Sequence, residues 1–235
     1  MSITIRWIGQ AGVIVTTDKG SLAVDPFCGS AKGNSQRIYP SIIDKENPVH
    51  VDMVLSTHSH WDHFDPETYV DYVIPDVIVG PGTVMAALER SKLEIEGIRL
   101  DRRQSIERNG FKITATAADH DIDSVGYIVE FDGYKLYFSG DALFTGNTIM
   151  PNVNMKPDIT FVCINGKLGN MNYIEATSYC KILQTKVGIP MHYDTIIHNT
   201  ENPKEFTDAM ARSAPDILAK VLERGKVYDI EELLK

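Results

Sequence analysis

The sequence predicts an α/β fold in which two β-sheets pack face to face and helices cover the outer faces. Short alternating strands joined by tight turns fill residues 2–25 and 104–138. In the second of these stretches, Asn109-Gly110 and Asp132-Gly133 are strong signals for two-residue hairpin turns. Helical patterns lie between and after the strand-rich stretches, so we expect the helices to form the outer layers.

The elements of the N-terminal half follow from alternation and from helix-start signals. Asp65 is a good N-cap and Pro66 a good first helical residue, so a helix starts there. Val84, Ala87 and Leu88 recur at helical spacing and predict a second helix. The expected strands are 2–8, 12–17, 21–25, 51–57, 76–79 and 97–100, and the expected helices are 66–73 and 83–90.

The C-terminal half contains two further hairpins, a buried strand and a capped helix. Asn172 and Glu175 have the spacing of a capping box, and Ala176, Tyr179 and Leu183 give the helix an apolar face. The expected strands are 104–108, 111–117, 124–131, 134–138, 159–164, 187–191 and 226–230, and the expected helices are 172–186, 203–210 and 216–222.

Length and composition predict one soluble domain spanning residues 1–235. No Pro-, Gly- or Ser-rich linker divides the 235 residues, and 43% hydrophobic with 23% charged residues is typical of a globular protein. The net charge of −9 argues against binding to nucleic acid or to an anionic membrane. We therefore expect a small-molecule partner and allow for a homo-oligomer.

The compartment expected from the sequence is the cytoplasm. The N-terminus alternates and lacks the continuous apolar segment of a signal peptide, and no stretch is long enough to span a membrane. Cys28, Cys163 and Cys180 are odd in number and have no C-x-x-C spacing, which favours reduced thiols.

A dense cluster of metal-ligand residue types follows the strand at 51–57. His58, His60, Asp62 and His63 have the spacing H-x-H-x-D-H, and the helix at Pro66 begins directly afterwards. Neutral imidazoles and carboxylates are ligands for zinc and other first-row divalent ions. Four such residues in one turn exceed what one ion needs from a single segment, so the motif predicts two ions.

Three more residues of the same kind lie just beyond later strands. His120 follows strand 111–117, Asp141 follows strand 134–138 and His192 follows strand 187–191. In a layered α/β fold such strand ends converge on one edge. The sequence therefore predicts one site assembled from His58, His60, Asp62, His63, His120, Asp141 and His192.

The motifs Thr57-His-Ser-His-Trp-Asp-His63, Ala118-Asp-His120, Phe138-Ser-Gly-Asp141 and Met191-His-Tyr-Asp194 resemble the metallo-β-lactamase superfamily of binuclear metal hydrolases. Further segments are similar to its L-ascorbate-6-phosphate lactonase-like branch, and the resemblance runs from about residue 3 to about residue 210. These segments are His63–Tyr69, Ile164-Asn-Gly166, Gly169-Asn-Met171, Glu175-Ala176 and Pro190–Asp194. Ascorbate-phosphate lactonases are considerably longer chains, so we expect a different substrate pocket.

The resemblance implies a four-layer αββα sandwich, two divalent ions and a role for each ligand. His58, His60 and His120 would hold one ion, and Asp62, His63 and His192 the other. Asp141 would bridge the two ions. Asp62 and His192 are the catalytic candidates, with Asp62 passing a proton to the leaving alkoxide, and Asp25 would lie beneath the metals. Ligands with only nitrogen and oxygen donors admit Mn²⁺ or Zn²⁺.

Substrate contacts are expected from the loops around this site. The irregular stretch 27–50 precedes the metal-binding strand and supplies Arg37. The remaining candidates follow strand 159–164 or the ligand His192: they are Asn165, Lys167, Asn170, Thr195, His198 and Asn199. Arg37, Lys167 and His198 would supply donors and positive charge to a phosphate group.

The function favoured by the sequence is hydrolysis of a lactone or a related ester, with a phosphorylated sugar lactone of the L-ascorbate 6-phosphate type as one version. Two alternatives stay open, since a fold does not determine a function. One is a phosphodiesterase or ribonuclease, against which the acidic charge weighs. The other is a metal-binding regulatory protein without turnover, which the full set of seven ligands opposes.

Overall fold

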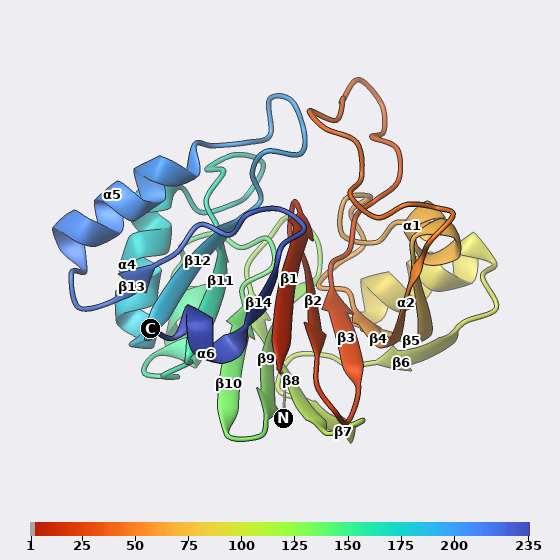
Figure 1. Cartoon of the computed structure of the whole chain (residues 1–235), viewed down its shortest axis with the longest axis horizontal. Coiled ribbons are helices and arrows are strands. Elements are labelled where there is room, and N and C mark those ends of the chain that lie inside the picture. Colours follow the sequence, from red (N-terminus) through yellow and green to blue (C-terminus); the bar gives the residue numbers. More distant parts are fainter. Residues whose placement is uncertain (1–2) are drawn as a thin grey trace.

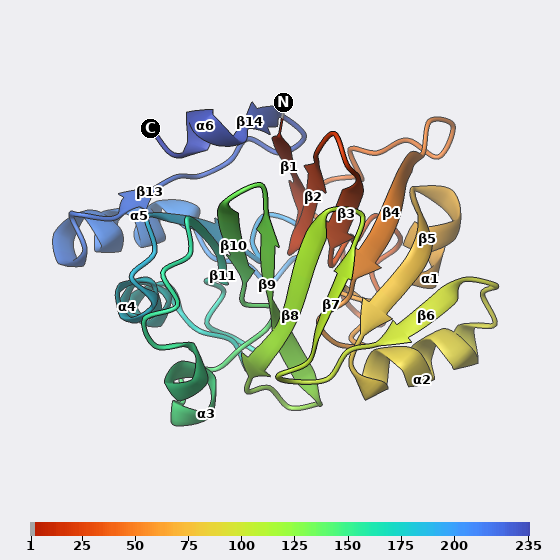
Figure 2. The same ribbon diagram turned by 90° about the horizontal axis from the view of Figure 1, so that it is seen from below.

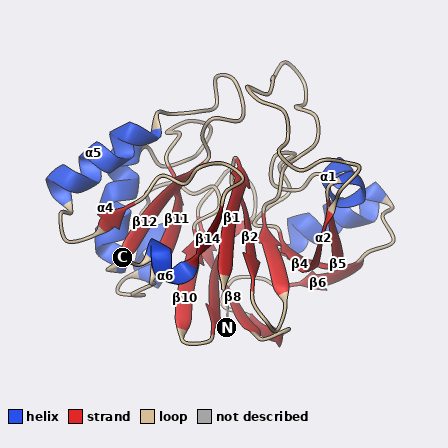
Figure 3. Cartoon of the chain, in the orientation of Figure 1, coloured by secondary structure: helices blue, strands red, loops and turns tan. Residues whose placement is uncertain are grey.

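The computed structural model describes residues 3–235 and contains two seven-stranded sheets that face each other. Helices lie on the outer side of both sheets, as the blue ribbons on either flank of Figure 3 show. The expected sandwich of two sheets between helical layers is confirmed. Residue 2, with which the first strand was expected to begin, lies outside the described residues.

The first sheet has the order β14-β1-β2-β3-β4-β5-β6. Its pairs from β14 to β3 are antiparallel, with short turns joining β1 to β2 and β2 to β3, and its pairs from β3 to β6 are parallel. The strands are β1 (Thr4–Gly9), β2 (Gly12–Thr16), β3 (Ser21–Val24), β4 (Val49–Leu55), β5 (Val73–Gly80), β6 (Glu96–Arg99) and β14 (Val227–Asp229).

The second sheet has the order β13-β12-β11-β10-β9-β8-β7 and repeats this plan. Its hairpin-connected strands from β7 to β10 are antiparallel, and its pairs from β10 to β13 are parallel. The strands are β7 (Ser105–Arg108), β8 (Phe111–Ala118), β9 (Ser124–Phe131), β10 (Tyr134–Phe138), β11 (Ile159–Cys163), β12 (Val187–Met191) and β13 (Leu218–Ala219).

The helices divide between the two sheets. In Figure 2, α1 and α2 lie beside the first sheet, whereas α3, α4 and α5 lie beside the second. Within residues 3–235, no helix is long and apolar enough to cross a bilayer. The helices are α1 (Pro66–Asp71), α2 (Gly82–Ser91), α3 (Gly146–Ile149), η1 (a 3₁₀ turn, Met150–Asn152), α4 (Tyr173–Leu183), α5 (Pro203–Ser213) and α6 (Ile230–Leu233).

The main core fills the space between the sheets. Side chains from both inner faces meet there, including Val13 and Leu55 from the first sheet and Tyr127 and Phe161 from the second, all fully buried. A second cluster, with Val54 as a member, packs the outer face of the first sheet against α1 and α2. The parallel strands are therefore apolar on both faces, which explains their continuous hydrophobic runs.

Most expected elements are present, but the tail departs from the expectation. Residues 216–222 were expected to be helical and this is wrong: Leu218–Ala219 forms β13, an edge strand parallel to β12. The Leu218 N–H donates to the Lys186 carbonyl at 3.0 Å, so pairing with the sheet overrides local helical preference. The helix expected at 172–186 ends at Leu183, because Gln184 adopts a left-handed conformation with φ 57°.

The loops that follow the strands gather at one end of the sandwich. The stretch after β3 and the stretch after β12 rise together at the top of Figure 1. They are joined by hydrogen bonds from the Ile38 N–H to the Thr195 carbonyl at 2.8 Å and from the Ile197 N–H to the Gln36 carbonyl at 2.9 Å. This end of the molecule carries the residues predicted to bind metal.

Candidate metal centre

The seven predicted ligands come together from both sheets. One group follows β4 in the first sheet, and the others follow β8, β10 and β12 in the second. Parallel strands present their carboxyl ends at the same edge, and the two sheets bring these edges face to face. The residues are His58, His60, Asp62 and His63 after β4, His120 after β8, Asp141 after β10 and His192 after β12.

Hydrogen bonds to backbone carbonyls within the turn after β4 hold the turn in its conformation. The Ser56 hydroxyl donates to the carbonyl of His58 at 3.1 Å or to that of His63 at 3.0 Å, and the Phe64 N–H donates to the His60 carbonyl at 2.8 Å. The buried Asp65 then caps α1, accepting from the Thr68 N–H at 3.2 Å. The expected N-cap is confirmed, and the helix start anchors the far end of the turn.

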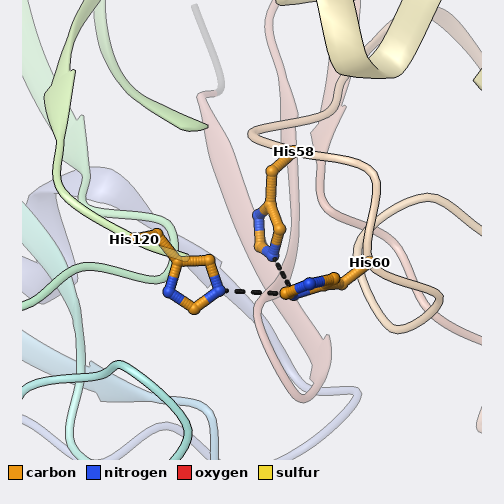
Figure 4. A group of neighbouring side chains, drawn as sticks. All are labelled: His58, His60 and His120. Carbon is orange, nitrogen blue, oxygen red and sulfur yellow. Dashed lines mark hydrogen bonds between the residues drawn. The ribbon is translucent and has the colours of Figure 1, made fainter. Parts of the chain in front are cut away.

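His58, His60 and His120 form one compact group. The Nε2 atom of His58 lies 3.0 Å from Nδ1 of His60, and Nε2 of His120 lies 3.3 Å from the same Nδ1 atom. Figure 4 shows the three rings converging from two different segments. Their nearest nitrogens all lie within 4.8 Å of one another, which is the spacing that three ligands of one ion require.

Asp62, His63 and His192 form a second group, and Asp141 lies between the two. The Nε2 atom of His192 is 3.4 Å from Oδ2 of Asp62. One Asp141 oxygen, Oδ1, lies 3.2 Å from His63 Nε2 and 3.3 Å from His192 Nε2, while Oδ2 lies 4.0 Å from His120 Nε2. The Asp141 carboxylate thus faces both groups, one oxygen to each.

The residues present fit a pair of divalent ions. His63 Nε2 and Asp141 Oδ1 are buried and lie 3.2 Å apart, but neither makes a hydrogen bond of good geometry to the other or to any further described residue. Leaving such groups unsatisfied costs about 1–3 kcal/mol each, so buried polar atoms of this kind need a partner. A metal ion supplies one, and the all-nitrogen and oxygen donor set suits zinc or manganese.

Hydrogen bonds on the far side of three imidazoles orient them toward this centre. Nδ1 of His63 lies 2.8 Å from Asp25 Oδ2, and the Asp25 carboxylate also accepts from the Thr57 N–H and hydroxyl, both at 2.7 Å. Nδ1 of His58 lies 3.0 Å from the Thr57 hydroxyl oxygen. Nδ1 of His120 pairs with the Gly169 carbonyl at 3.2 Å. With Nδ1 engaged, Nε2 of each ring is free to bind metal.

Burial and neighbouring charges shift the pKa values of these groups in different directions. Burial lowers the pKa of His58 well below its usual range. Burial opposes protonation of His192 too, but Asp141 and Asp62 outweigh it and raise the pKa of His192 to about 9. Burial would raise the pKa of Asp62, yet His63 and His192 hold it below its ordinary value. The carboxylates are therefore ionised, and metal binding must displace protons from neighbouring imidazoles.

A cavity of about 310 Å³ opens onto the centre. Its size suits a small molecule. Three of the candidate ligands line it, together with residues of the loops that surround the site. The lining residues are Ser35, His60, Trp61, Asp62, Asp121, Asp141, Leu168, Gly169 and Asn199.

Three of the predicted substrate-binding residues form one network at this cavity. The Asn165 amide donates to the Asn199 side-chain oxygen at 2.8 Å, and the Asn170 amide donates to the Asn165 side-chain oxygen at 3.0 Å. Asn199 lines the cavity, so Asn165 and Asn170 support it from behind.

The other four predicted substrate contacts lie outside the cavity lining of the described chain. Arg37 donates to the Gly29 carbonyl at 3.0 Å, and Lys167 donates to the Thr200 carbonyl at 3.3 Å. The Thr195 hydroxyl accepts from the Gln10 N–H at 2.7 Å. His198 is exposed and has a positive φ of 65°. Substrate contact by Arg37, Lys167, Thr195 and His198 stays a prediction.

Gln10 is a residue of the centre that sequence reasoning missed. It lies in the turn between β1 and β2, is fully buried, and donates from Nε2 to Asp62 Oδ2 at 2.8 Å. The same nitrogen lies 3.1 Å from His192 Nε2, whereas Gln10 Oε1 is buried and has no hydrogen-bond partner within residues 3–235. The sequence feature that could have indicated Gln10 is a polar residue between Gly9 and Ala11 in the turn that joins two apolar strands.

The comparisons with known proteins agree with this fold. A family model described as "Beta-lactamase superfamily domain" matches residues 4–192. The chain belongs to this family, the metallo-β-lactamase superfamily.

Individual relatives share its whole length at low identity. A UPF0173 metal-dependent hydrolase of Methanobrevibacter smithii is 27% identical, with 96% of each chain covered. One of Methanopyrus kandleri is 25% identical over 96% of this chain and 99% of its own. The structure of Igni18, a metallo hydrolase from Ignicoccus hospitalis, superposes with a TM-score of 0.74 at 21% identity, covering 97% and 98% of the two chains.

Proposed function

We propose that the protein is a metal-dependent hydrolase with two metal ions, which opens a lactone or cleaves a related ester. One observation carries the proposal: two groups of three candidate ligands meet at one cavity, which His60 of one group and Asp62 of the other line, and Asp141 directs one oxygen to each group. The family membership and the names of the relatives support the enzyme class.

In this proposal, different residues of the chain would bind the metal ions and transfer the proton. His58, His60 and His120 would hold one ion, and Asp62, His63 and His192 the other. Such a pair supplies activation of water and polarisation of a carbonyl group. Water then adds its oxygen to the acyl carbon, the acyl carbon–oxygen bond breaks, and the leaving alkoxide takes a proton. Asp62 would pass that proton, and the 2.8 Å hydrogen bond from Gln10, which fixes the orientation of its carboxylate, supports this role.

The substrate class follows from the cavity and from the resemblance to the lactonase-like branch. A volume of about 310 Å³ and a net charge of −9 favour a small molecule over nucleic acid. A phosphorylated sugar lactone would need a cation at the cavity. In the part of the chain that the structure describes, the lining residues include neither lysine nor arginine. Lys167 would have to leave its contact with Thr200 to supply one.

The decisive experiment is hydrolysis of L-ascorbate 6-phosphate and of simple lactones by protein loaded with Mn²⁺ or Zn²⁺, followed as proton release. We expect turnover of a lactone or ester that disappears in His120→Ala, which removes one of the three ligands proposed for the first ion. Bound metal without turnover of any lactone or ester would overturn the proposal. Cleavage of labelled RNA or of a phosphodiester would then establish the alternative function.

A further inference from the structure

The loop between β11 and α4 places an exposed leucine beside the metal centre. An isolated bridge between Asn165 and Asn172 closes the loop at its base. Leu168, near its tip, lines the cavity and is 74% exposed. An exposed leucine is ordinary on a protein surface, but one that borders a candidate reaction site can contact what binds there.

The backbone at this position disfavours leucine. The Asn170 N–H donates to the Lys167 carbonyl at 3.2 Å and closes a two-residue turn, in which φ is 53° at Leu168 and 87° at Gly169. Turns with two positive φ values favour Asn, Asp or Gly at the first central residue. Strain of this kind is often kept where a side chain has a function.

The metal centre itself prevents the turn from relaxing. The Gly169 carbonyl pairs with His120 Nδ1, and a Cβ atom on Gly169 would lie 2.8 Å from that nitrogen. Behind the turn, Asn170 is tied through Asn165 to Asn199. The Leu168 side chain is thus held at the cavity by contacts that also orient a metal ligand.

Trp61 gives the same cavity a second large apolar surface. It lies between the ligands His60 and Asp62 in the sequence, and its ring packs edge-on against Phe27 with centroids 5.2 Å apart. Beyond Trp61, Leu168 and Gly169, every lining residue that the structure describes is polar or acidic. The described lining therefore combines polar and acidic residues with two apolar side chains, and it offers neither lysine nor arginine to a phosphate group.

We propose that Leu168 and Trp61 bind an apolar substituent of the substrate, so that Leu168 determines specificity for esters or lactones carrying a small alkyl or aryl group. This inference rests on the proposed function, since it names the substrate class of the same site. It predicts a higher kcat/KM for neutral, partly apolar substrates than for phosphorylated sugar lactones.

The test is a chain-length series of p-nitrophenyl esters from acetate to hexanoate with metal-loaded protein. We expect kcat/KM to rise by about twofold to fourfold per methylene, the gain from partial to full burial of one CH₂ group. Leu168→Asn should reduce the hexanoate-to-acetate ratio by on the order of tenfold, because it removes most of the apolar contact. Asparagine suits the positive φ, so the variant should fold at least as well as the natural chain.

A matched control removes an equally exposed apolar side chain elsewhere. Met150 is 73% exposed and lines a different cavity beside η1. Met150→Asn should leave the chain-length dependence unchanged. If Leu168→Asn and Met150→Asn give the same ratio as the natural chain, Leu168 does not determine specificity and the inference is wrong.

A binding series separates this inference from the proposed function. Alkyl hydroxamates from aceto- to hexanohydroxamate chelate metal and need no turnover. Tighter binding with chain length that is lost in Leu168→Asn supports the apolar contact, even if no ester is hydrolysed and the proposed function fails. Equal affinity across the series in the natural chain overturns the inference, whatever the ester assays show.

Discussion

At the scale of single residues, the centre is organised by contacts between segments far apart in the chain. Gln10 is the clearest case. Its carbonyl accepts from the His192 N–H at 2.9 Å, its N–H donates to the Thr195 hydroxyl, and its side chain donates to Asp62. One residue in a turn of the first sheet thereby positions ligands from both sheets.

Replacing Gln10 by methionine keeps the side-chain length and removes the amide. We expect Gln10→Met to weaken binding of the second metal ion by about 10- to 100-fold, because the carboxylate of Asp62 loses the donor that orients it. Competition with a chromophoric chelator measures both affinities. Trp7→Phe is the control: it removes the 3.1 Å hydrogen bond from Trp7 to the Gln10 carbonyl and should lower stability without changing metal affinity. Equal metal binding by Gln10→Met and the natural chain would contradict the prediction.

The raised pKa of His192 predicts how metal uptake depends on pH. Asp141 and Asp62 raise this pKa to about 9, so a proton must leave the imidazole before it binds metal at neutral pH. Apparent metal affinity should therefore rise with pH up to about 9 and then level off. Calorimetric titration in buffers of different ionisation enthalpy will measure the released protons. Uptake without proton release at pH 7 would count against the assignment of His192.

At the scale of elements, local signals decide where helices begin. The Asn172 side chain accepts from the N–H groups of Ile174 at 2.9 Å and Glu175 at 3.0 Å, and the Glu175 carboxylate accepts from the Asn172 N–H at 3.0 Å. This capping box starts α4 at the base of the loop that carries Leu168. The expected capping box is confirmed by these contacts.

Asn172→Ala should lower the free energy of unfolding by about 1 kcal/mol, because two helix N–H groups lose their acceptor. Urea denaturation followed by circular dichroism measures the change. Ser178→Ala, within the same helix, should cost nothing or stabilise slightly, since serine has the lower helix propensity. An Asn172→Ala variant as stable as Ser178→Ala would show that the cap is not needed.

At the scale of the whole molecule, the proposed metal ligands join the two sheets. Four of them follow a strand of the first sheet and three follow strands of the second. Ions held there would stabilise the packing of one sheet on the other as well as the reaction centre, because they bind only when both edges are in place.

Metal removal should therefore lower the melting temperature by about 5–10 °C for each ion lost. An ion present at about 100 times its dissociation constant contributes about 2.7 kcal/mol, and each kcal/mol shifts the melting temperature of a protein of this size by about 2–4 °C. Calorimetry with and without a chelator measures the shift. A chelator should affect His120→Ala less, and an unchanged melting temperature in the natural chain would argue against tightly bound ions.

The sequence by itself determined the sandwich fold and the seven candidate ligands. The spacing from His58 to His63 is local, and each later candidate follows a strand whose alternation is visible in the chain. Asp25 also lies at a strand end, and it lies 2.8 Å from His63 Nδ1, while its position beneath the metals, which the resemblance implies, stays a prediction. Such features are readable because periodicity and strand ends depend on neighbouring residues alone.

Only the tertiary structure decided which other residues join the centre. Gln10 contacts His192 across 182 positions, and Gly169 orients His120 across 49. The edge strand at Leu218 likewise forms because Lys186 offers it a carbonyl, which no local pattern predicts. Arg37 and Thr195 have the residue types of substrate contacts, yet their hydrogen bonds join loops. These outcomes depend on packing between distant segments, whereas sequence pattern reports the preferences of each segment separately.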